Sequence, residues 1–231
     1  MTIGLVMLSL IMAAILWWLF RQTINVQPWQ AQAAFDARAG AVMRPPAKIA
    51  LWVFLLVVTS FFALFVSAYA MRLGLADWSP LPRPRLLMLN TAFLVAASLA
   101  MQWAVHAGRR GQPVTMQRGL TAGGLLSLGF LFGQLVVWKQ LNDAGFIVAS
   151  GASADFFYLL TAVHGLHVLG GVVAWLRASL RAWRGTDPAR TRLAVELCAT
   201  YWHYLLAVWL VLYALLVTDA LGLSICSATP L

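Results

Sequence analysis

The chain has 231 residues, of which 62% are hydrophobic and only 10% are charged. So few charges cannot cover a soluble domain of this size with a polar surface, so the composition excludes an ordinary soluble protein and indicates a membrane protein. The net charge of +9 does not indicate a nucleic-acid partner, because the basic residues lie between long apolar runs and not along one face. Cys198 and Cys226 have neither metal-site spacing nor a disulfide pattern.

The first apolar run extends from Ile3 to Phe20. A helix needs about 20 apolar residues to cross the bilayer core. The run lacks a preceding basic segment and is followed directly by Arg21, so it predicts a retained helix and not a cleaved signal. We expect residues 1–48 to form an N-terminal transmembrane helix and a cytoplasmic linker.

Five further apolar runs reach the length of a membrane span. They are Ile49 to Met71, Leu86 to His106, Leu120 to Trp138, Phe156 to Leu176 and Ala194 to Thr218. Since backbone polar groups in lipid must be paired within the segment, each run predicts a helix. The predicted fold is therefore all-α, a polytopic membrane bundle of about six transmembrane helices. Residues 49–220 form a five-helix bundle in this prediction, and residues 221–231 form a short outer tail.

Lysine and arginine predict the orientation of the bundle, because cytoplasmic loops carry an excess of them. Twelve of the sixteen basic residues fall in the loops after the first, third and fifth predicted helices. We therefore expect both termini on the outer side of the membrane.

Histidines provide the main ionisable groups inside the predicted spans. His164 and His167 lie in the fifth span, and His203 lies in the sixth. His167 and His203 are each about 14 Å from the inner ends of their helices, so we expect them to face each other. One interpretation is a haem or metal site. We prefer the other, structural hydrogen bonding across the helix interface, because no acidic residue or third histidine lies at that depth.

Charged residues at the inner membrane boundary suggest a second kind of site. Glu196, the only glutamate in the chain, lies at a similar depth to Arg177 and Arg181. A guanidinium group can hold a phosphate through two hydrogen bonds while its stem remains in the apolar layer. We predict that Arg181, helped by Arg177, binds an anionic phospholipid, with Glu196 orienting one arginine. The alternative is that these arginines only set the topology.

Glycines are concentrated where helices would approach closely. Gly129 and Gly133 form a Gly-x-x-x-Gly pair, and the fifth span contains Gly165, Gly170 and Gly171. Such spacings are typical of helix packing in membranes.

Two sequence motifs resemble subunit III of the haem-copper oxidases, the family of cytochrome c oxidase and its quinol-oxidase relatives. The first is the run from Phe157 to Gly171, which contains His164-Gly165-Leu166-His167. The second combines Glu196 with Tyr201-Trp202-His203 and Trp209. Arg181 falls where the family usually has an arginine associated with bound phospholipid. The resemblance extends from about Ile49 to Thr218, and the chain looks like a member that has lost the first of seven helices.

The resemblance implies a non-catalytic scaffold of a proton-pumping terminal oxidase. Subunits of this kind hold no haem or copper, so these cofactors are expected in partner subunits, namely the catalytic subunit I and subunit II. The chain is expected to bind structural phospholipid, to stabilise the catalytic subunit and to support proton uptake. Its expected location is the inner (plasma) membrane, as a multi-pass protein. The resemblance assigns the family motif to His164, His167, Glu196, Tyr201, Trp202 and His203.

The sequence departs from the family at positions that often carry carboxylates. The matching residues here are Val57 and Val58, Val137 and Leu206, so a role in proton handling that needs those groups is not expected. Two other functions remain open, an accessory subunit of a nitric oxide reductase and a haem-binding electron-transfer protein that uses His167 and His203. A small-molecule transporter is disfavoured because no internal repeat is visible.

Overall fold

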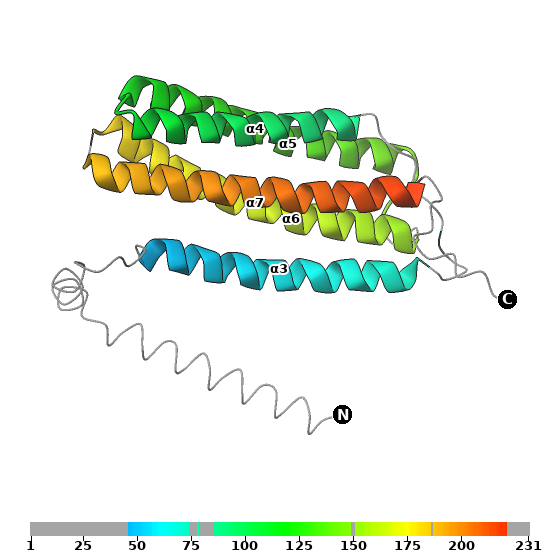
Figure 1. The fold of residues 1–231 in the computed structure, drawn as a ribbon. Helices are drawn as coiled ribbons and strands as arrows, with labels where there is room; N and C mark the ends of the chain where they lie inside the picture. The colour runs from blue at the N-terminus through cyan, green and yellow to red at the C-terminus, as the bar shows by residue number, and fades with distance from the viewer. Residues whose placement is uncertain (1–45, 74–77, 79–85, 149–150, 186, 221–231) are drawn as a thin grey trace. The chain divides into compact units, whose positions relative to one another are not determined.

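The computed structural model describes residues 46–73, 78, 86–148, 151–185 and 187–220 of the chain. These ranges contain no strand and five helices, labelled as in Figure 1: α3 (Pro46–Arg72), α4 (Leu86–Arg109), α5 (Pro113–Asp143), α6 (Ala152–Trp183) and α7 (Pro188–Ala220). The all-α prediction is confirmed. The predicted helix from Ile3 to Phe20 and most of the linker after it lie outside the described residues.

All five described helices are long and apolar enough to cross a membrane. Each ends beyond its predicted apolar run, and all but α4, which begins at Leu86 as predicted, also begin before it, because the ends carry polar residues that a hydropathy criterion leaves out. Prolines stand at the first position of α3, α5 and α7. Proline fits there because its missing N–H is one that the first turn of a helix leaves unpaired in any case. The chain is therefore a multi-pass membrane protein.

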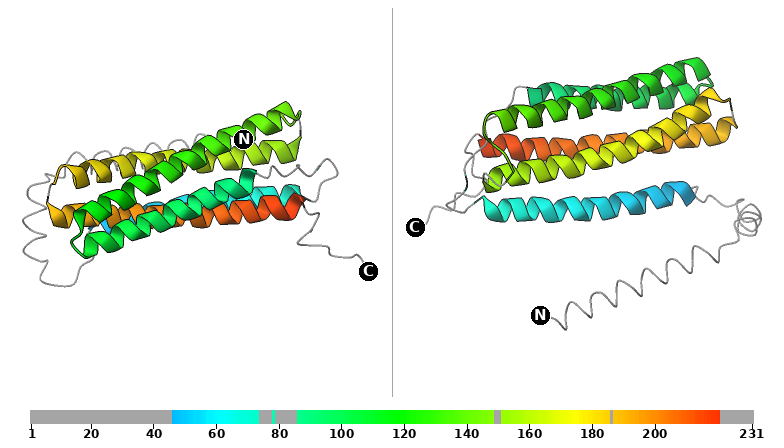
Figure 2. Two further views of the ribbon diagram at one scale, coloured as in Figure 1. Left: turned by 90° about the horizontal axis from the view of Figure 1, so that it is seen from above. Right: turned by 180° about the vertical axis from the view of Figure 1, so that it is seen from behind.

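Helices α4 to α7 pack as two layers, α4 with α5 and α6 with α7 (Figures 1 and 2). Across the layers, α4 contacts α7 and α5 contacts α6. Small residues permit the close approach of α4 and α5: a Cβ atom on Gly119 would lie 2.9 Å from the Cβ of Ala104. Small residues at interfaces are the usual basis of tight helix packing in membranes.

Helix α3 forms a third layer beside α6 and α7 and is spaced more widely than its neighbours (Figure 1). No Cα of α3 comes within 8 Å of a Cα in α4 to α7. Large side chains bridge the space. The ring of Phe62 lies 5.4 Å from that of His167, and the ring of Tyr69 lies 5.7 Å from that of Phe156. The interface of α3 is therefore built from side chains and not from close backbone contact.

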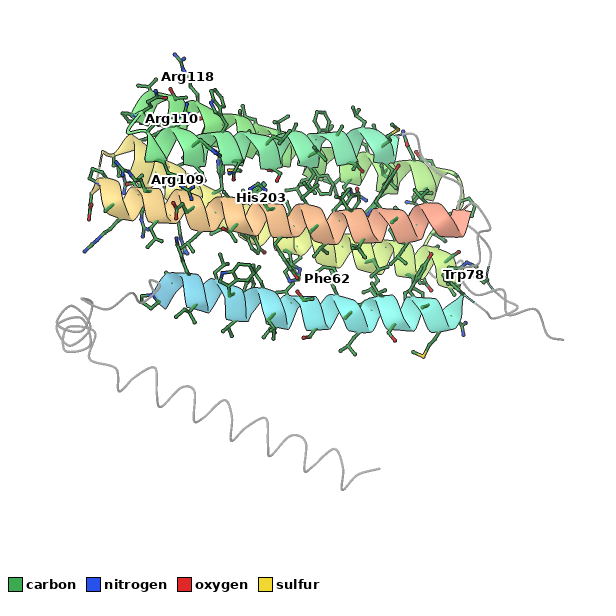
Figure 3. All side chains as sticks on the ribbon, in the orientation of Figure 1. Phe62, Trp78, Arg109, Arg110, Arg118 and His203 are labelled. Carbon is green, nitrogen blue, oxygen red and sulfur yellow. The ribbon has the colours of Figure 1, made fainter. Side chains whose placement is uncertain are left out.

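The basic residues at the ends of the helices follow the predicted alternation. Arg109, Arg110 and Arg118 lie together at one end of the bundle, whereas Trp78 lies at the opposite end (Figure 3). We call the end with these arginines the inner end, after the topology prediction. Which side of the membrane it faces stays a prediction.

Candidate functional site

His164 lies at the centre of the bundle and is completely buried. Its ring is surrounded by the rings of Trp209 at 5.2 Å, Phe130 at 5.8 Å and Phe62 at 6.4 Å. Neither ring nitrogen has a hydrogen-bond partner among the described residues. Its observed contacts are therefore with aromatic rings from three other helices, α3, α5 and α7.

His167 does not face His203, so that expectation is wrong. His167 Nδ1 donates to the carbonyl oxygen of Val163 on its own helix, at 2.7 Å, and its ring packs against Phe62 of α3. The sequence predicts depth along each helix but not the direction in which a side chain leaves it. The direction depends on where the neighbouring helices lie.

His203 lies on the opposite side of α7, against α4. Its Nε2 donates to Gln102 Oε1 at 3.0 Å, and its Nδ1 accepts from the hydroxyl of Ser98. The predicted hydrogen bonding across a helix interface is therefore present at His203, but the partners are on α4 and not on α6. The imidazole remains exposed on the outside of the bundle.

Tyr201 and Trp202 connect α7 to the two helices behind it. The hydroxyl of Tyr201 donates to the carbonyl oxygen of His167 at 3.0 Å, and Trp202 Nε1 donates to Ser127 Oγ at 2.6 Å. Both rings pack onto Gly171, where a Cβ atom would lie 3.0 Å from each. A Cβ atom added at Gly165 or Gly170 would meet no atom of another helix within 4 Å, so Gly171 is the member of that set that permits close packing.

Glu196 joins three helices at the inner end of the bundle. Its carboxylate accepts from Lys48 Nζ of α3 at 2.8 Å and from Arg109 Nε of α4 at 3.2 Å. The expectation that Glu196 orients Arg177 or Arg181 is therefore wrong. Antiparallel packing places the last turn of α4 beside the first turns of α7, which gives the carboxylate a nearer cation.

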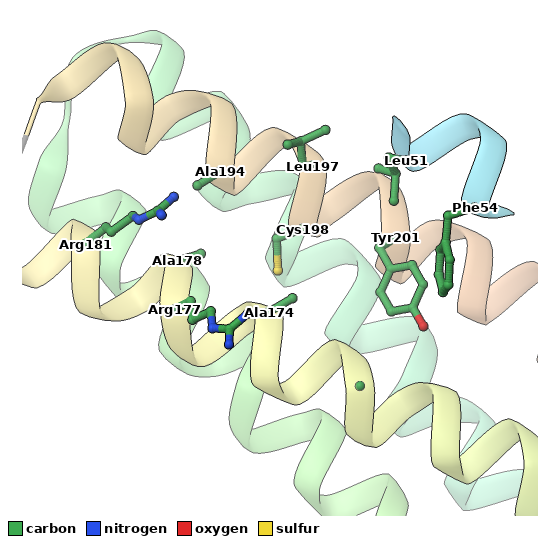
Figure 4. Close-up of a pocket in the computed structure, with 11 residues that line it drawn as sticks. Leu51, Phe54, Ala174, Arg177, Ala178, Arg181, Ala194, Leu197, Cys198 and Tyr201 are labelled. Atoms are coloured by element: carbon green, nitrogen blue, oxygen red, sulfur yellow. The ribbon is translucent and has the colours of Figure 1, made fainter. Parts of the chain in front are cut away.

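Arg177 and Arg181 line a pocket of about 390 Å³ between α3, α6 and α7. Figure 4 shows both arginines on α6, across the pocket from Ala194 and Cys198 of α7. The rest of the lining is largely apolar and includes Phe54 of α3. The pocket lies where the wide spacing of α3 leaves room between the helices.

A second pocket of about 740 Å³ adjoins the first and shares Arg181, Ala194 and Leu197 with it. Its other lining residues at the inner end include Arg184, Arg190 and Asp187, and the Asp187 carboxylate pairs with Arg190 at 3.4 Å. The two pockets together form a groove that is apolar toward the membrane interior and basic at the inner end. Arg177 and Arg181 lie between these two regions.

The positions that often carry carboxylates in the family are apolar in this bundle. Val58 and Val137 are buried, Leu206 is half-buried and Val57 is exposed on α3. Within the described residues, no group of three histidine, cysteine or acidic side chains lies close enough to hold a metal ion.

Fold and site together define a polytopic membrane helix bundle with a basic groove at one end and a histidine motif on each of α6 and α7. The family model of cytochrome c oxidase subunit III matches residues 1–218. The chain therefore belongs to the cytochrome c oxidase subunit III family, which confirms the resemblance found in the motifs and extends it to the N-terminal residues.

Curated relatives agree with this assignment. The probable cytochrome c oxidase subunit 3 of Mycobacterium tuberculosis is 31% identical over 158 residues, which cover 67% of this chain and 77% of the relative. That of Nocardia farcinica is 31% identical over 156 residues, covering 66% and 76%. Cytochrome c oxidase subunit 3 of Equus caballus is 31% identical over 140 residues, covering 61% of this chain and 51% of the relative.

The sequence analysis missed the partners of the two most polar motif residues. Gln102 and Ser98 hold His203, and Lys48 and Arg109 hold Glu196. A signal for the first pair was present, since Ser98, Gln102 and His106 recur every fourth residue in an otherwise apolar run and so share one helix face.

Proposed function

We propose that this protein is the cofactor-free third subunit of a haem-copper terminal oxidase, in which it stabilises the catalytic subunit. The observation that carries the proposal is the family match over residues 1–218, which includes both histidine motifs. The relatives are named cytochrome c oxidase subunit 3 or probable cytochrome c oxidase subunit 3. The proposed partners of this chain are the catalytic subunit I and subunit II. The complex lies in the inner (plasma) membrane and takes electrons from cytochrome c or a quinol.

The haem-binding alternative receives little support from the geometry of the histidines. A bis-histidine haem needs two imidazoles that point at one iron, whereas His167 packs toward α3 and His203 toward α4. Both nitrogens of His203 already take part in hydrogen bonds within the bundle. This argument favours the oxidase subunit.

Affinity purification of the tagged chain from its own membranes tests the assignment. We expect a haem-copper catalytic subunit and its cofactors to co-purify, and the separated chain to show no haem absorption. A catalytic subunit without the active-site copper ligands would favour a nitric oxide reductase instead. Haem that stays with the separated chain, and disappears in a His203→Leu variant, would overturn the proposal.

We also propose that the groove at the inner end holds an anionic phospholipid. Its apolar part, lined by Leu51 and Phe54 of α3, has the character needed for acyl chains. Its basic part carries Arg181, Arg184 and Arg190. Polar and apolar regions in this order match the headgroup and chains of a lipid whose phosphate lies at the membrane boundary.

Arg181 is the arginine most suited to the phosphate, because it alone among these arginines lines both parts of the groove. Arg177, one turn of α6 away, lines the apolar part and adds a second positive charge. Long arginine stems can remain in the apolar layer while the guanidinium groups reach the headgroup level. The competing explanation, basic residues that only set topology, applies equally to every inner loop.

An Arg181→Ala variant is expected to lose anionic lipid that co-purifies with the complex, and to inactivate sooner during turnover with a nearly unchanged initial rate. The reason is that the lipid contributes to the durability of the complex and not to the chemistry. Lipid mass spectrometry and long activity traces provide the measurements. Arg118→Ala is the matched control, because Arg118 is an exposed arginine on α5 that does not line the groove. Equal lipid content in the two variants would contradict the proposal.

Support of proton uptake is part of the proposed function, and we propose that it comes from groups at the inner end. Of the described acidic side chains, Asp143, Asp155 and Asp187 lie in or beside the terminal turns of their helices, and Glu196 lies in the third turn of α7. The interior positions Val58 and Val137 cannot carry protons. Carboxylate groups that support proton uptake in this proposal therefore lie near the inner end, as Glu196 does, and the imidazole of His106 is a further exposed titratable group.

A further inference from the structure

A pocket of about 990 Å³ lies between α5 and α6 at the end of the bundle opposite to the inner end, where Trp78 also lies (Figure 3). We call this end the outer end. Trp138 and Lys139 of α5 line the pocket on one side, and Asp155 and Leu159 of α6 line it on the other. None of these residues lines the groove at the inner end, so the two sites are separate.

Hydrogen bonds within the chain hold the wall of this outer pocket in place. The hydroxyl of Tyr158 on α6 donates to the carbonyl oxygen of Phe146 at 2.8 Å, and Trp138 Nε1 donates to Thr161 Oγ1 at 3.1 Å. The rings of Trp138 and Tyr158 also pack edge to face, with centroids 5.8 Å apart. These contacts join α5, the connection after it and α6. The wall is therefore formed before any ligand binds, which lowers the entropic cost of binding.

The outer pocket presents one positive and one negative side chain. Lys139 and Asp155 are both exposed, and no ion pair joins them in the part of the chain that the structure describes. Their charges cancel, whereas the groove at the inner end is lined by four arginines and a single aspartate. The groove thus favours a ligand with net negative charge. The outer pocket favours a ligand that carries both charges.

The remaining lining of the outer pocket is suited to acyl chains. Val148, Leu159 and Ala162 are apolar and exposed. Trp138 and Tyr158 are the two residue types that are enriched where a bilayer changes from hydrocarbon to headgroups. Charged groups beside apolar ones at this level match a phospholipid and not a small water-soluble ion.

We propose that the outer pocket binds a zwitterionic phospholipid with a primary ammonium group, a phosphatidylethanolamine. Its phosphate accepts from the ammonium group of Lys139, and its own ammonium group donates to the carboxylate of Asp155. A primary ammonium has three N–H donors, whereas the quaternary ammonium of a choline headgroup has none. A carboxylate has about four acceptor positions, so Asp155 can take the headgroup in addition to other contacts. Because the pocket lies at the outer end, this lipid belongs to the opposite leaflet from the lipid of the groove.

Photo-crosslinking with a labelled lipid tests the site in the purified complex. The complex is placed in phosphatidylcholine nanodiscs that contain a small fraction of phosphatidylethanolamine with a diazirine in one acyl chain. After irradiation, we expect mass spectrometry to find the lipid on the peptide that carries Leu159 and Ala162. Unlabelled phosphatidylethanolamine should compete for this cross-link, whereas added phosphatidylcholine, or inorganic phosphate with free ethanolamine, should not.

Variants of the two charged residues provide a second measurement. Asp155→Asn and Lys139→Gln are each expected to lower the cross-link about fivefold, the upper range for an exposed ion pair. The matched control is Asp143→Asn, an exposed acidic residue of α5 that does not line the pocket and should leave the cross-link unchanged. Arg181→Ala should also leave it unchanged, because Arg181 belongs to the groove.

Equal competition by phosphatidylcholine would mean that the pocket holds only the general lipid of the bilayer, and would overturn the inference. Competition by phosphate with ethanolamine would show a site for free ions and would also overturn it. The same holds if the Asp155 and Asp143 variants cross-link equally. Loss of the cross-link in Arg181→Ala would place the labelled lipid in the groove and contradict a separate outer site.

Discussion

Gly133 on α5 permits a contact that no other residue would allow. A Cβ atom at this position would lie 2.0 Å from Asn90 Oδ1 of α4. Asn90 is fully buried and its amide donates to Gln134 Oε1 at 3.3 Å. Gly129, the other member of the Gly-x-x-x-Gly pair, has only Phe93 near its Cβ position, at 3.9 Å. Only one glycine of the pair therefore serves close packing.

This difference gives a prediction with a built-in control. Gly133→Ala is expected to destabilise the chain by about 1–3 kcal/mol, because the added methyl group displaces the fully buried Asn90 amide from its hydrogen bond with Gln134. Gly129→Ala is expected to be neutral or to stabilise by up to about 1 kcal/mol, since alanine is the better helix former. Thermal unfolding of the purified complex in detergent provides the comparison. Equal unfolding midpoints for the two variants would show that the Asn90 contact contributes nothing.

Which of the motif residues meet was beyond what the sequence could predict. The depths of His167 and His203 follow from helix geometry, and both residues lie inside the membrane span as expected. The direction in which each side chain points depends on the rotation of its helix. The ring of His167 packs against Phe62 of α3, whereas His203 forms a hydrogen bond with Gln102 of α4. Local periodicity contains no information on which helices become neighbours, and that gap explains the error.

Helix α3 is the element most dependent on single side chains. Its backbone is held away from the other helices, so its position relies on bridging rings, on the hydrogen bond between Thr59 and Tyr204 at 3.0 Å, and on the ion pair of Lys48 with Glu196. An exposed ion pair contributes only about 0.2–1 kcal/mol. Even so, the ion pair between Lys48 and Glu196 is a polar contact that holds the inner end of α3 to α7. The groove separates α3 from α6 and α7 there and so reduces apolar packing between them.

Glu196→Gln is therefore expected to loosen the inner end of α3 without unfolding the bundle. The substitution keeps the shape but removes the negative charge, which leaves Lys48 and Arg109 as neighbouring cations. Hydrogen exchange followed by mass spectrometry should show faster exchange in residues 46–54. The control is Asp187→Asn, which removes an exposed pair with Arg190 at 3.4 Å and should leave α3 unchanged. Unchanged exchange in the Glu196 variant would mean that the rings alone hold α3.

The existence of each described helix could be predicted from hydropathy, since apolar runs of membrane length allow no other regular structure. The helix ends could not be predicted in this way. The first turns of α5 (Pro113 to Gly119) and of α7 (Pro188 to Leu193) contain residues that are too polar or too small to be recognised as part of an apolar run. The groove also could not be predicted, because it follows from the wide spacing of α3 and not from any motif.

For the whole molecule, the predicted topology places the arginine-rich end of the bundle in the cytoplasm and both termini outside. In a background without Cys226, a cysteine introduced at Gln112, between α4 and α5, is expected to be protected from a membrane-impermeant thiol reagent in intact cells. A cysteine at Ala144, after α5, is expected to react. Both positions are exposed, so accessibility alone does not separate them. The reverse labelling pattern would require the opposite orientation, and permeabilised cells show that both thiols can react.

The wide spacing of α3 also has a consequence for biogenesis. During synthesis, α4 and α5 emerge one after the other and can pair at once through Gly119 and Ala104. In contrast, the described contacts of α3 are with α6 and α7, whose residues begin 80 or more positions later in the chain. Among the described helices, α3 must therefore wait in the membrane without its partners until α6 and α7 have been synthesised. Assembly factors or lipids that occupy its aromatic face during this interval would then set the order in which the subunit matures.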